Sequence, residues 1–215
     1  MKPVYIWEFP VRLSHWLGVL SIVILSVTGF YIGSPFMHAT EAESLITSHM
    51  RFIHFTAAYV FAVSVILRMY WWFGGNEYAR LSQFIPTTSE RLQNVRKTAK
   101  FYAFCQGKLP YTPGHTGLAG LTYTFLFLLY LIEITTGFAM LSVAHGGGTV
   151  WTLLGGWSLG LMGASYLRLV HHLVMWVIWC IVILHVYTGW ENDIVERNGL
   201  MSSIFSGYKS LDEKY

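Results

Sequence analysis

The chain has 215 residues, of which 54% are hydrophobic and only 12% are charged. Soluble domains average about 25% charged residues, so this deficit excludes an ordinary soluble domain. Together with a mean hydropathy of +0.47, it predicts an integral membrane protein. The formal net charge of +3 is too small to indicate a nucleic-acid binder, and the length fits a single membrane domain over residues 1–215.

The N-terminal segment has no short apolar core followed by a small-residue cleavage site. We therefore expect the first hydrophobic segment to be a retained span and not a removed signal peptide. The two cysteines, Cys105 and Cys180, stand alone, and no Cys-x-x-Cys-His sequence occurs. This pattern argues against covalently attached haem, a zinc cluster or a disulfide framework.

Four apolar stretches are long enough to cross hydrocarbon about 30 Å thick, which takes roughly 20 helical residues. They cover about residues 13–32, 50–73, 118–143 and 166–190. Helices are expected because lipid offers the backbone no hydrogen-bond partners. The sequence therefore predicts an all-α fold, namely an integral membrane four-helix bundle.

Basic residues gather in the segment 74–117, between the second and third spans. They are Arg80, Arg91, Arg96, Lys97, Lys100 and Lys108. The other two connections carry no such cluster, so the positive-inside rule predicts that both termini and the 74–117 loop are cytoplasmic. Ser/Thr residues before Glu90 predict a short helix in this loop, either among lipid headgroups or in the cytoplasm.

The fourth span carries three histidines. A helix advances 1.5 Å and about 100° per residue, so His171 and His185, fourteen residues apart, lie roughly 21 Å apart on nearly one face. His172 falls on a different face, about 140° away from His185. Spacing therefore selects His171 as the companion of His185, and we expect His172 to pack or to support a ligand.

Histidines on other spans match these two heights. His15 lies about one turn inside the cytoplasmic start of the first span, as His185 does at the end of the fourth. His54 lies just inside the outer start of the second span, as His171 does for the fourth. We call His15 and His185 the inner pair, and His54 and His171 the outer pair.

Each pair offers one imidazole from either side of a flat macrocycle, which is what a b-type haem requires, and helix bundles often hold such cofactors between facing helices. We therefore predict two non-covalent haem b groups, with the inner and outer pairs as iron ligands. The alternative for any single membrane histidine is a hydrogen-bonded packing role. Three histidines in or beside the outer loops have no such pairing: His38, His49 and His145.

Arg12, Arg51 and Arg168 each precede a histidine of these pairs by three residues. An Arg at that spacing shares the helix face, and its charge could pair with haem propionates. The alternative is that these arginines flank the span ends and snorkel towards water.

Gly29 follows His15 by fourteen residues and therefore lies on the same face at the outer level. A missing side chain there would let the outer macrocycle approach closely. The recurrent Thr-Gly pairs at 28–29, 136–137 and 188–189 could instead serve helix packing. Glu133 is the only acid deep inside a span, where an ionised carboxylate costs about 3 kcal/mol. We expect it to hydrogen-bond across helices while protonated, or to hand on a proton.

The chain resembles the b-type cytochrome subunit of membrane-bound nickel–iron hydrogenases. The resemblance covers nearly the whole chain and rests on "RLSHWLGVLSIVILSVTGFYIG", "RFIHFTAAYVFAVSVILRMYWWFGGNEYAR", "GHTGLAG", "LVHHLVMW…ILHVYTGW" and the tail "SSIFSGYKS". The second stretch and the tail are the most specific. The ligating histidines of that family match His15, His54, His171 and His185. Thr116 and Gly117 depart from the Asn and Pro that relatives tend to have there, which weakens any role carried over to that turn.

The resemblance implies partners and a direction of electron flow. The small (iron–sulfur) and large (nickel–iron) hydrogenase subunits would lie on the outer face of the bacterial inner membrane. Electrons would pass from them to the outer haem, to the inner haem and then to a membrane quinone. His115, the only other histidine on the inner side, is the candidate for hydrogen-bonding a quinone carbonyl, or else a helix-start residue. This chain has no cysteine set for splitting hydrogen.

Other functions stay open at this stage. The cytochrome b subunit of another respiratory complex, such as formate dehydrogenase or thiosulfate reductase, shares the four-helix, two-haem plan. A proton-coupled transporter could use the histidines and Glu133 as a relay, but it predicts broken helices or an inverted repeat, which the sequence does not show. A plain anchor subunit would leave the histidine pairs unexplained.

Overall fold

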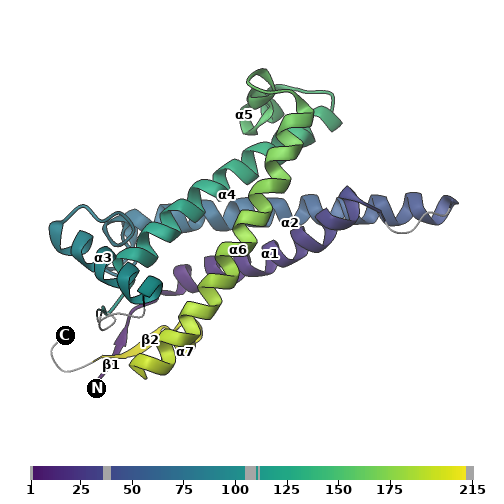
Figure 1. Ribbon diagram of the computed structural model, residues 1–215. Coiled ribbons are helices and arrows are strands. Elements are labelled where there is room, and N and C mark those ends of the chain that lie inside the picture. The colour runs from purple at the N-terminus through teal and green to yellow at the C-terminus, as the bar shows by residue number, and fades with distance from the viewer. Residues whose placement is uncertain (1, 36–39, 105–109, 111, 212–215) are drawn as a thin grey trace. The chain divides into compact units, whose positions relative to one another are not determined.

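The computed structural model describes residues 2–35, 40–104, 110 and 112–211, without the side chains of residues 40–44. This part of the chain is mostly helical (Figure 1). Its four long helices are α1 (Phe9–Gly33), α2 (Thr40–Gly74), α4 (Gly117–Ala144) and α6 (Ala164–Glu196). Each contains one of the predicted spans, and all four are long and apolar enough to cross a membrane.

Two of the long helices extend well beyond the apolar stretches that predicted them. α2 begins ten residues before the expected span, and α6 continues past Trp190 through the polar sequence "ENDIVE". The limit of an apolar stretch marks where hydrocarbon ends, whereas a helix can continue into water with polar side chains. Residues 50–73 and 166–190 are therefore the apolar parts of longer helices.

The loop 74–117 contains the short helix that the sequence predicts, α3 (Ser89–Phe104). The hydroxyl of Thr88 accepts a hydrogen bond from the backbone N–H of Arg91 at 3.3 Å, which is a helix-start contact. Four shorter helical segments are not predicted by the apolar pattern. They are η1 (Leu81–Gln83), α5 (Thr149–Leu154), η2 (Gly156–Gly160) and α7 (Leu200–Ser206).

The all-α prediction also misses a small antiparallel sheet near the chain ends (Figure 1). β1 (Lys2–Tyr5) pairs with β2 (Tyr208–Leu211), with Lys2 opposite Leu211 and Tyr5 opposite Tyr208. Each strand has only four residues, too short for a clear alternating pattern. The pairing joins segments about 200 positions apart, which local sequence does not reveal.

The chain divides into two compact units. Unit 1 comprises Met1–Arg12, Met69–Leu131 and Trp176–Tyr215, and unit 2 comprises Leu13–Arg68 and Ile132–Met175. Each of the four long helices contributes residues to both units. His54 and His171, the outer pair, both belong to unit 2. His15 belongs to unit 2 and His185 to unit 1.

Asn76, in the "GNEYAR" stretch, fixes the N-terminal segment in unit 1. Its side-chain amide donates to the carbonyl of Ile6 at 3.0 Å, and its Oδ1 accepts the N–H of Ala79 at 3.0 Å. The Glu8 carboxylate accepts the backbone N–H of Asn76 at 2.7 Å and the indole N–H of Trp71 at 2.8 Å. The N-terminal segment is thus bonded to the end of α2.

The C-terminal tail closes on the same segment. Trp7 donates its indole N–H to Ser203 Oγ at 2.9 Å, and the Gly207 carbonyl accepts the Ile6 N–H at 2.9 Å. Gly207 has φ +89°, and a Cβ there would lie 2.5 Å from the Tyr5 ring, so this position requires glycine. "GNEYAR" and "SSIFSGYKS", the stretches that most favour the hydrogenase resemblance, therefore bind one N-terminal segment.

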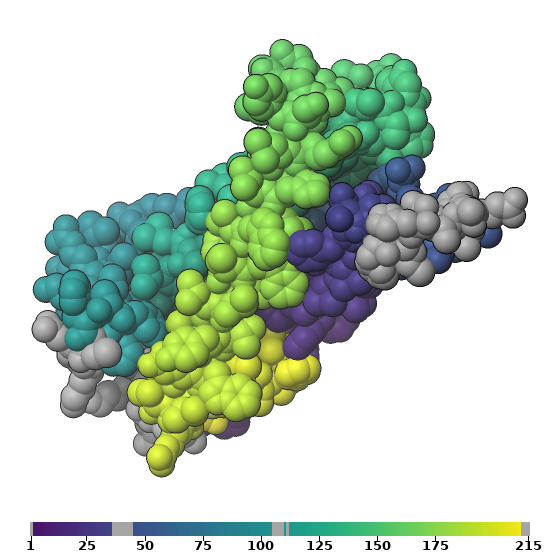
Figure 2. All heavy atoms as spheres, turned by 45° about the vertical axis from the view of Figure 1, so that its right-hand side comes forward, coloured from purple at the N-terminus to yellow at the C-terminus, as the bar shows by residue number. Residues whose placement is uncertain are grey.

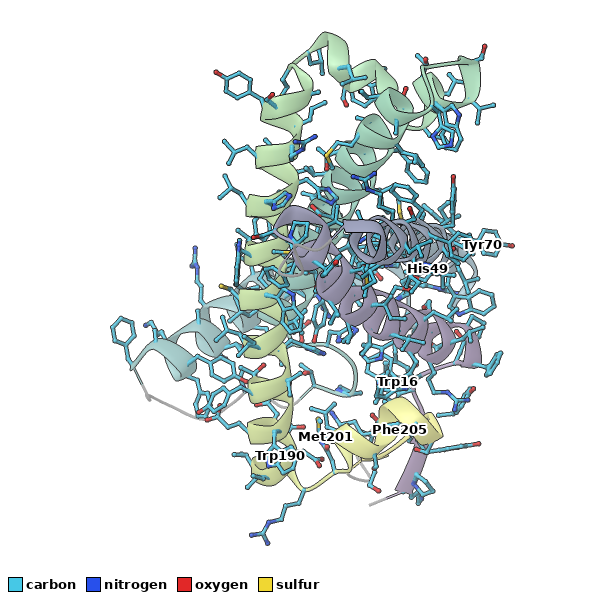
Figure 3. All side chains as sticks on the ribbon, turned by 90° about the vertical axis from the view of Figure 1, so that its right-hand side faces the viewer. Trp16, His49, Tyr70, Trp190, Met201 and Phe205 are labelled. Carbon is cyan, nitrogen blue, oxygen red and sulfur yellow. The ribbon has the colours of Figure 1, made fainter. Side chains whose placement is uncertain are left out.

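Two further contacts connect the tail to α6 in unit 1. Met201 of α7 lies beside Gly189 of α6, with its sulfur 3.3 Å from where a Cβ would stand. Figure 3 labels Met201 on α7 and Trp190, the residue after Gly189, on α6. Lys209 in β2 is buried and lies with its Nζ 3.4 Å from Glu196 Oε2. Burial lowers the pKa of Lys209, and the nearby Glu196 carboxylate opposes that shift. The charge of the lysine is thus partly compensated within the fold.

Small and hydroxyl-bearing residues line the helix contacts of unit 2. Gly18 of α1 faces Ser64 of α2, and the Tyr59 ring of α2 lies 5.5 Å from the Phe138 ring of α4. Small side chains allow close approach of membrane helices, and their hydroxyls are satisfied by backbone carbonyls. Along α6, large apolar side chains such as Leu173 and Trp176 are exposed, as expected of a helix that faces lipid. Figure 2 shows the yellow-green atoms of α6 on the surface that faces the viewer.

Candidate functional site

His54 of the outer pair is held by a Thr-Gly pair on the neighbouring helix. In unit 2, Nδ1 of His54 on α2 lies 2.9 Å from the hydroxyl oxygen of Thr28 on α1. The Thr28 hydroxyl donates its own proton to the Ile24 carbonyl at 2.7 Å, one turn back on α1. Thr28 is only 4% exposed, so its hydroxyl is buried between the two helices.

His171 of the outer pair has the same surroundings from the other two helices. Its Nδ1 on α6 lies 2.9 Å from the hydroxyl oxygen of Thr136 on α4. The Thr136 hydroxyl donates to the Ile132 carbonyl at 2.8 Å, and Thr136 is also 4% exposed. The two hairpins, α1 with α2 and α4 with α6, thus build one local arrangement twice.

The glycine after each threonine lies against the same imidazole. A Cβ added to Gly29 would lie 3.3 Å from Cε1 of His54, and one added to Gly137 would lie 3.3 Å from Cε1 of His171. Such a distance is tighter than ordinary van der Waals contact. The Nδ1–Cε1 edge of each ring is therefore seated on the neighbouring helix.

These bonds determine which ring nitrogen is available to a ligand. Each threonine hydroxyl proton is already donated to a carbonyl, so the hydroxyl oxygen accepts from the imidazole Nδ1–H. Nδ1 then carries the proton and Nε2 carries the lone pair. An unprotonated Nε2 with Nδ1–H bonded elsewhere is the state in which histidine binds a metal. Each imidazole of the outer pair thus has Nε2 as its available donor atom, and their joint binding of one iron stays a prediction.

Glu133 contacts the outer pair directly. In unit 2 its Oε1 lies 3.3 Å from Nε2 of His171, and its side chain is 16% exposed. With Nδ1 protonated, Nε2 can only accept, so the contact suits a protonated carboxyl that donates. The contact joins α4 to α6, and the cross-helix hydrogen bond and the proton transfer expected of Glu133 both stay predictions. Nε2 of His171 has a single lone pair. A metal bound there would therefore displace the proton that Glu133 donates.

The remaining outer histidines lie in different environments. His172 is exposed, with its Cε1 3.2 Å from where a Cβ on Gly33 would stand. His49 and His145 each donate Nδ1–H to a carbonyl one turn back, Leu45 at 2.7 Å and Leu141 at 3.0 Å. They therefore have local packing or capping contacts. His38 lies outside the described residues.

The inner pair is divided between the units and stays a prediction from spacing. In unit 1, Nδ1 of His185 lies 2.9 Å from the phenol oxygen of Tyr123 on α4. That oxygen can accept the Nδ1–H, as ligation through Nε2 would require. In unit 2, the ring of His15 is half-buried and meets the neighbouring Trp16 edge to face at 5.1 Å.

His115 lies among aromatic rings in unit 1. Its centroid is 4.7 Å from that of Trp7, 4.9 Å from Tyr123 and 5.4 Å from Phe84. Tyr123 therefore contacts both His115 and His185. The quinone candidate thus lies one side chain away from a predicted inner ligand, and it also precedes the start of α4 at Gly117.

The three candidate arginines differ in their surroundings. Arg12 donates from Nη1 to the Phe205 carbonyl at 2.5 Å, so it joins α1 to the tail of unit 1. Arg51 and Arg168 are exposed on α2 and α6 of unit 2. The pairing of Arg12, Arg51 and Arg168 with haem propionates stays a prediction.

Sequence reasoning missed several residues around these groups. It identified the Thr-Gly pairs but assigned no role to the hydroxyls of Thr28 and Thr136, and it gave Tyr123 no role. It also passed over Arg68, a charged residue only 8% exposed inside an apolar stretch of α2. The signal was available for Arg68, since an ionisable residue inside a span marks a functional site by default.

The fold and these contacts define a class: a helical membrane protein with a histidine held by a buried threonine in each of two helical hairpins, within the apolar segments. The sequence profile described as prokaryotic cytochrome b561 matches residues 6–207 of the chain. The chain belongs to this family.

Individual relatives agree over nearly the full length. A protein of Cupriavidus necator, named "Probable Ni/Fe-hydrogenase B-type cytochrome subunit", is 37% identical, with 99% of this chain and 89% of the relative covered. A protein of the same name from Rhizobium leguminosarum bv. viciae is 34% identical, with 99% and 91% covered. A "Probable Ni/Fe-hydrogenase 1 B-type cytochrome subunit" of Escherichia coli K12 is 34% identical, with 96% and 90% covered. The resemblance stated from the sequence is confirmed.

Proposed function

We propose that this chain is the di-haem b membrane subunit that passes electrons from a periplasmic nickel–iron hydrogenase to membrane quinone. The relatives' names support the hydrogenase context, and membership in the cytochrome b561 family supports electron transfer through haem b. The chain would serve as the quinone-reducing subunit of a hydrogen:quinone oxidoreductase. Hydrogen splitting would belong to the large nickel–iron subunit, with the small iron–sulfur subunit between them.

The outer pair is the observation that carries this proposal. His54 and His171 come from different helices, and each has its Nδ1 on a threonine hydroxyl, which leaves Nε2 as the donor atom. On His171, iron would replace the contact of Nε2 with Glu133. Haem b, when bound, would supply a one-electron carrier, and His54 and His171 would hold its iron through Nε2. The residues around the outer pair fit that requirement, because each threonine orients its imidazole with Nε2 unprotonated.

The inner half of the proposal extends the same chemistry to His15 and His185. Tyr123 would hold the His185 ring, and His115 beside it would hydrogen-bond a quinone carbonyl. Arg51 and Arg168, exposed on their helices, would be free to pair with propionates of the outer haem. Gly29 would leave room beside His54 for the outer macrocycle.

A second candidate function rests on the contact between Glu133 and His171. A buried carboxyl donating to an imidazole inside a span is one step of a proton relay, as a proton-coupled transporter would use. In that case Nε2 would exchange protons and would not bind iron. A cytochrome b subunit of another respiratory complex is the closer alternative, because it would carry the same haem pairs.

The test is the haem content of the purified chain. We expect a reduced-minus-oxidised spectrum of haem b and a pyridine haemochrome assay that gives about two haems per polypeptide. A chain without haem would support the proton relay and end the redox proposal. About one haem would mean that one pair does not hold its cofactor. Co-purification with hydrogenase subunits, and not with another dehydrogenase, distinguishes the two cytochrome functions.

A further inference from the structure

The threonine–histidine contacts occur twice in unit 2 with the same geometry. Both Nδ1–Oγ1 distances are 2.9 Å, and both glycine contacts at Cε1 are 3.3 Å. Both threonines are 4% exposed. In both hairpins the Thr-Gly pair is on the first helix and the histidine on the second. Agreement in contact, burial and chain order makes an accidental packing contact a poor explanation.

A third Thr-Gly pair shows what the dipeptide does without a histidine partner. Thr188 on α6 donates to the Leu184 carbonyl at 2.9 Å, as Thr28 and Thr136 donate to their own helices. Gly189 faces the Met201 sulfur and not an imidazole. The backbone bond alone is therefore common to all three pairs, and the imidazole contact is a separate feature of two of them.

We propose that Thr28 and Thr136 are positioning residues of the outer pair, each fixing its histidine as the Nδ1–H tautomer and making Nε2 a stronger donor to iron. The inference rests on the proposed function, because it assigns these hydroxyls a role towards the outer haem. The chemistry is local: an oxygen that accepts Nδ1–H draws the proton away from the ring and raises the basicity of Nε2. Neither threonine touches the iron.

A stronger imidazole donor has a defined electrochemical effect. Ferric iron carries more positive charge than ferrous iron, so electron donation from Nε2 stabilises the ferric form more. Two such imidazoles would lower the reduction potential of a haem that they hold. The same contacts also hold both imidazole rings in fixed planes, because the Nδ1–Cε1 edge of each ring packs against the neighbouring helix.

The experiment replaces the hydroxyls without changing side-chain volume much. Thr28→Val and Thr136→Val remove the accepting oxygen, Thr28→Ser and Thr136→Ser retain it, and Thr188→Val is the matched control. The intact haem-loaded protein is used throughout. The measurements are haem per polypeptide, the midpoint potential of each haem by redox titration, and the ferric low-spin electron paramagnetic resonance spectrum.

We expect each valine variant to raise one haem potential and leave the other unchanged. An outer-sphere bond of this kind should change the ferric-to-ferrous ratio on the order of threefold to tenfold, roughly 30–60 mV at 59 mV per tenfold. The double valine variant should shift the same haem further and change its g values. The serine variants should return to the wild-type potential, and Thr188→Val should leave both haems unaffected.

Other results would overturn the inference. Valine variants that keep both haems with unchanged potentials and spectra would show that the hydroxyls serve only their own helices. Where valine causes loss of the outer haem, retention and normal potential in the serine variant support the inference, and loss in serine as well contradicts it. A wild-type chain without haem would instead refute the proposed function, which the haem assay reports separately.

Discussion

At the residue scale, hydrogen bonds distinguish histidines that spacing alone treats alike. His171 and His172 are neighbours, but only His171 has its Nδ1 on a buried threonine hydroxyl. His172 is exposed and points one ring carbon towards Gly33. Because a metal needs a neutral imidazole with a fixed Nε2, these surroundings favour His171 as the ligand. The helical-face argument from the sequence selects the same residue.

This difference gives a paired substitution test. We expect His171→Ala to remove the outer haem and reduce the haem content from about two to about one per polypeptide. His172→Ala should retain both haems, because its ring makes no contact that ligation requires. Pyridine haemochrome quantification on matched preparations measures the effect. Loss of haem in His172→Ala with retention in His171→Ala would contradict the assignment.

At the scale of elements, a few hydrogen bonds in unit 1 join segments distant in the chain. Asn76 and Glu8 connect the end of α2 to the N-terminal segment, and Trp7 with Gly207 connects that segment to the tail. β1 and β2 then align in a defined register. A buried polar group left without its partner costs about 1–3 kcal/mol, so the loss of one such side chain should be measurable.

Asn76→Ala tests the hydrogen bonds between the end of α2 and the N-terminal segment. The change removes the amide that donates to Ile6 and the oxygen that accepts from Ala79, so we expect a loss of about 2–3 kcal/mol of stability. For a chain of this size, that corresponds to a lower thermal midpoint by roughly 4–12 °C in detergent. Glu77→Ala, at the exposed neighbouring position, is the control and should change the midpoint little. Equal midpoints in both variants would show that the hydrogen bonds of Asn76 do not stabilise the fold.

At the scale of the whole molecule, the distribution of charge predicts how the chain lies in a membrane. The basic loop containing α3 is expected in the cytoplasm with both termini, and the connection containing α5 on the outer side. This sidedness places His54 and His171 towards the outer face, where a periplasmic hydrogenase would deliver electrons. The direction of electron flow in the proposal depends on it.

Single cysteines test this topology in a chain from which Cys105 and Cys180 have been removed. Leu153→Cys in α5, at a residue 75% exposed, should react with an impermeant maleimide in cells whose outer membrane alone is opened. Lys97→Cys in α3, also exposed, should react only after the inner membrane is permeabilised. The reverse labelling pattern would invert the predicted orientation and the proposed direction of electron transfer.

The sequence by itself determined the four apolar helices and the resemblance to a cytochrome family, and it predicted a height for each histidine. These follow from local composition, helical periodicity and matching stretches of residues. Periodicity gives the depth and face of a side chain, but it does not tell which helix lies opposite. Only the tertiary structure therefore paired Thr28 with His54, Thr136 with His171 and Glu133 with His171. The tertiary structure also determined the β1–β2 sheet and the hydrogen bonds of Asn76 with the N-terminal segment, because contacts between residues far apart in the chain depend on how the helices pack.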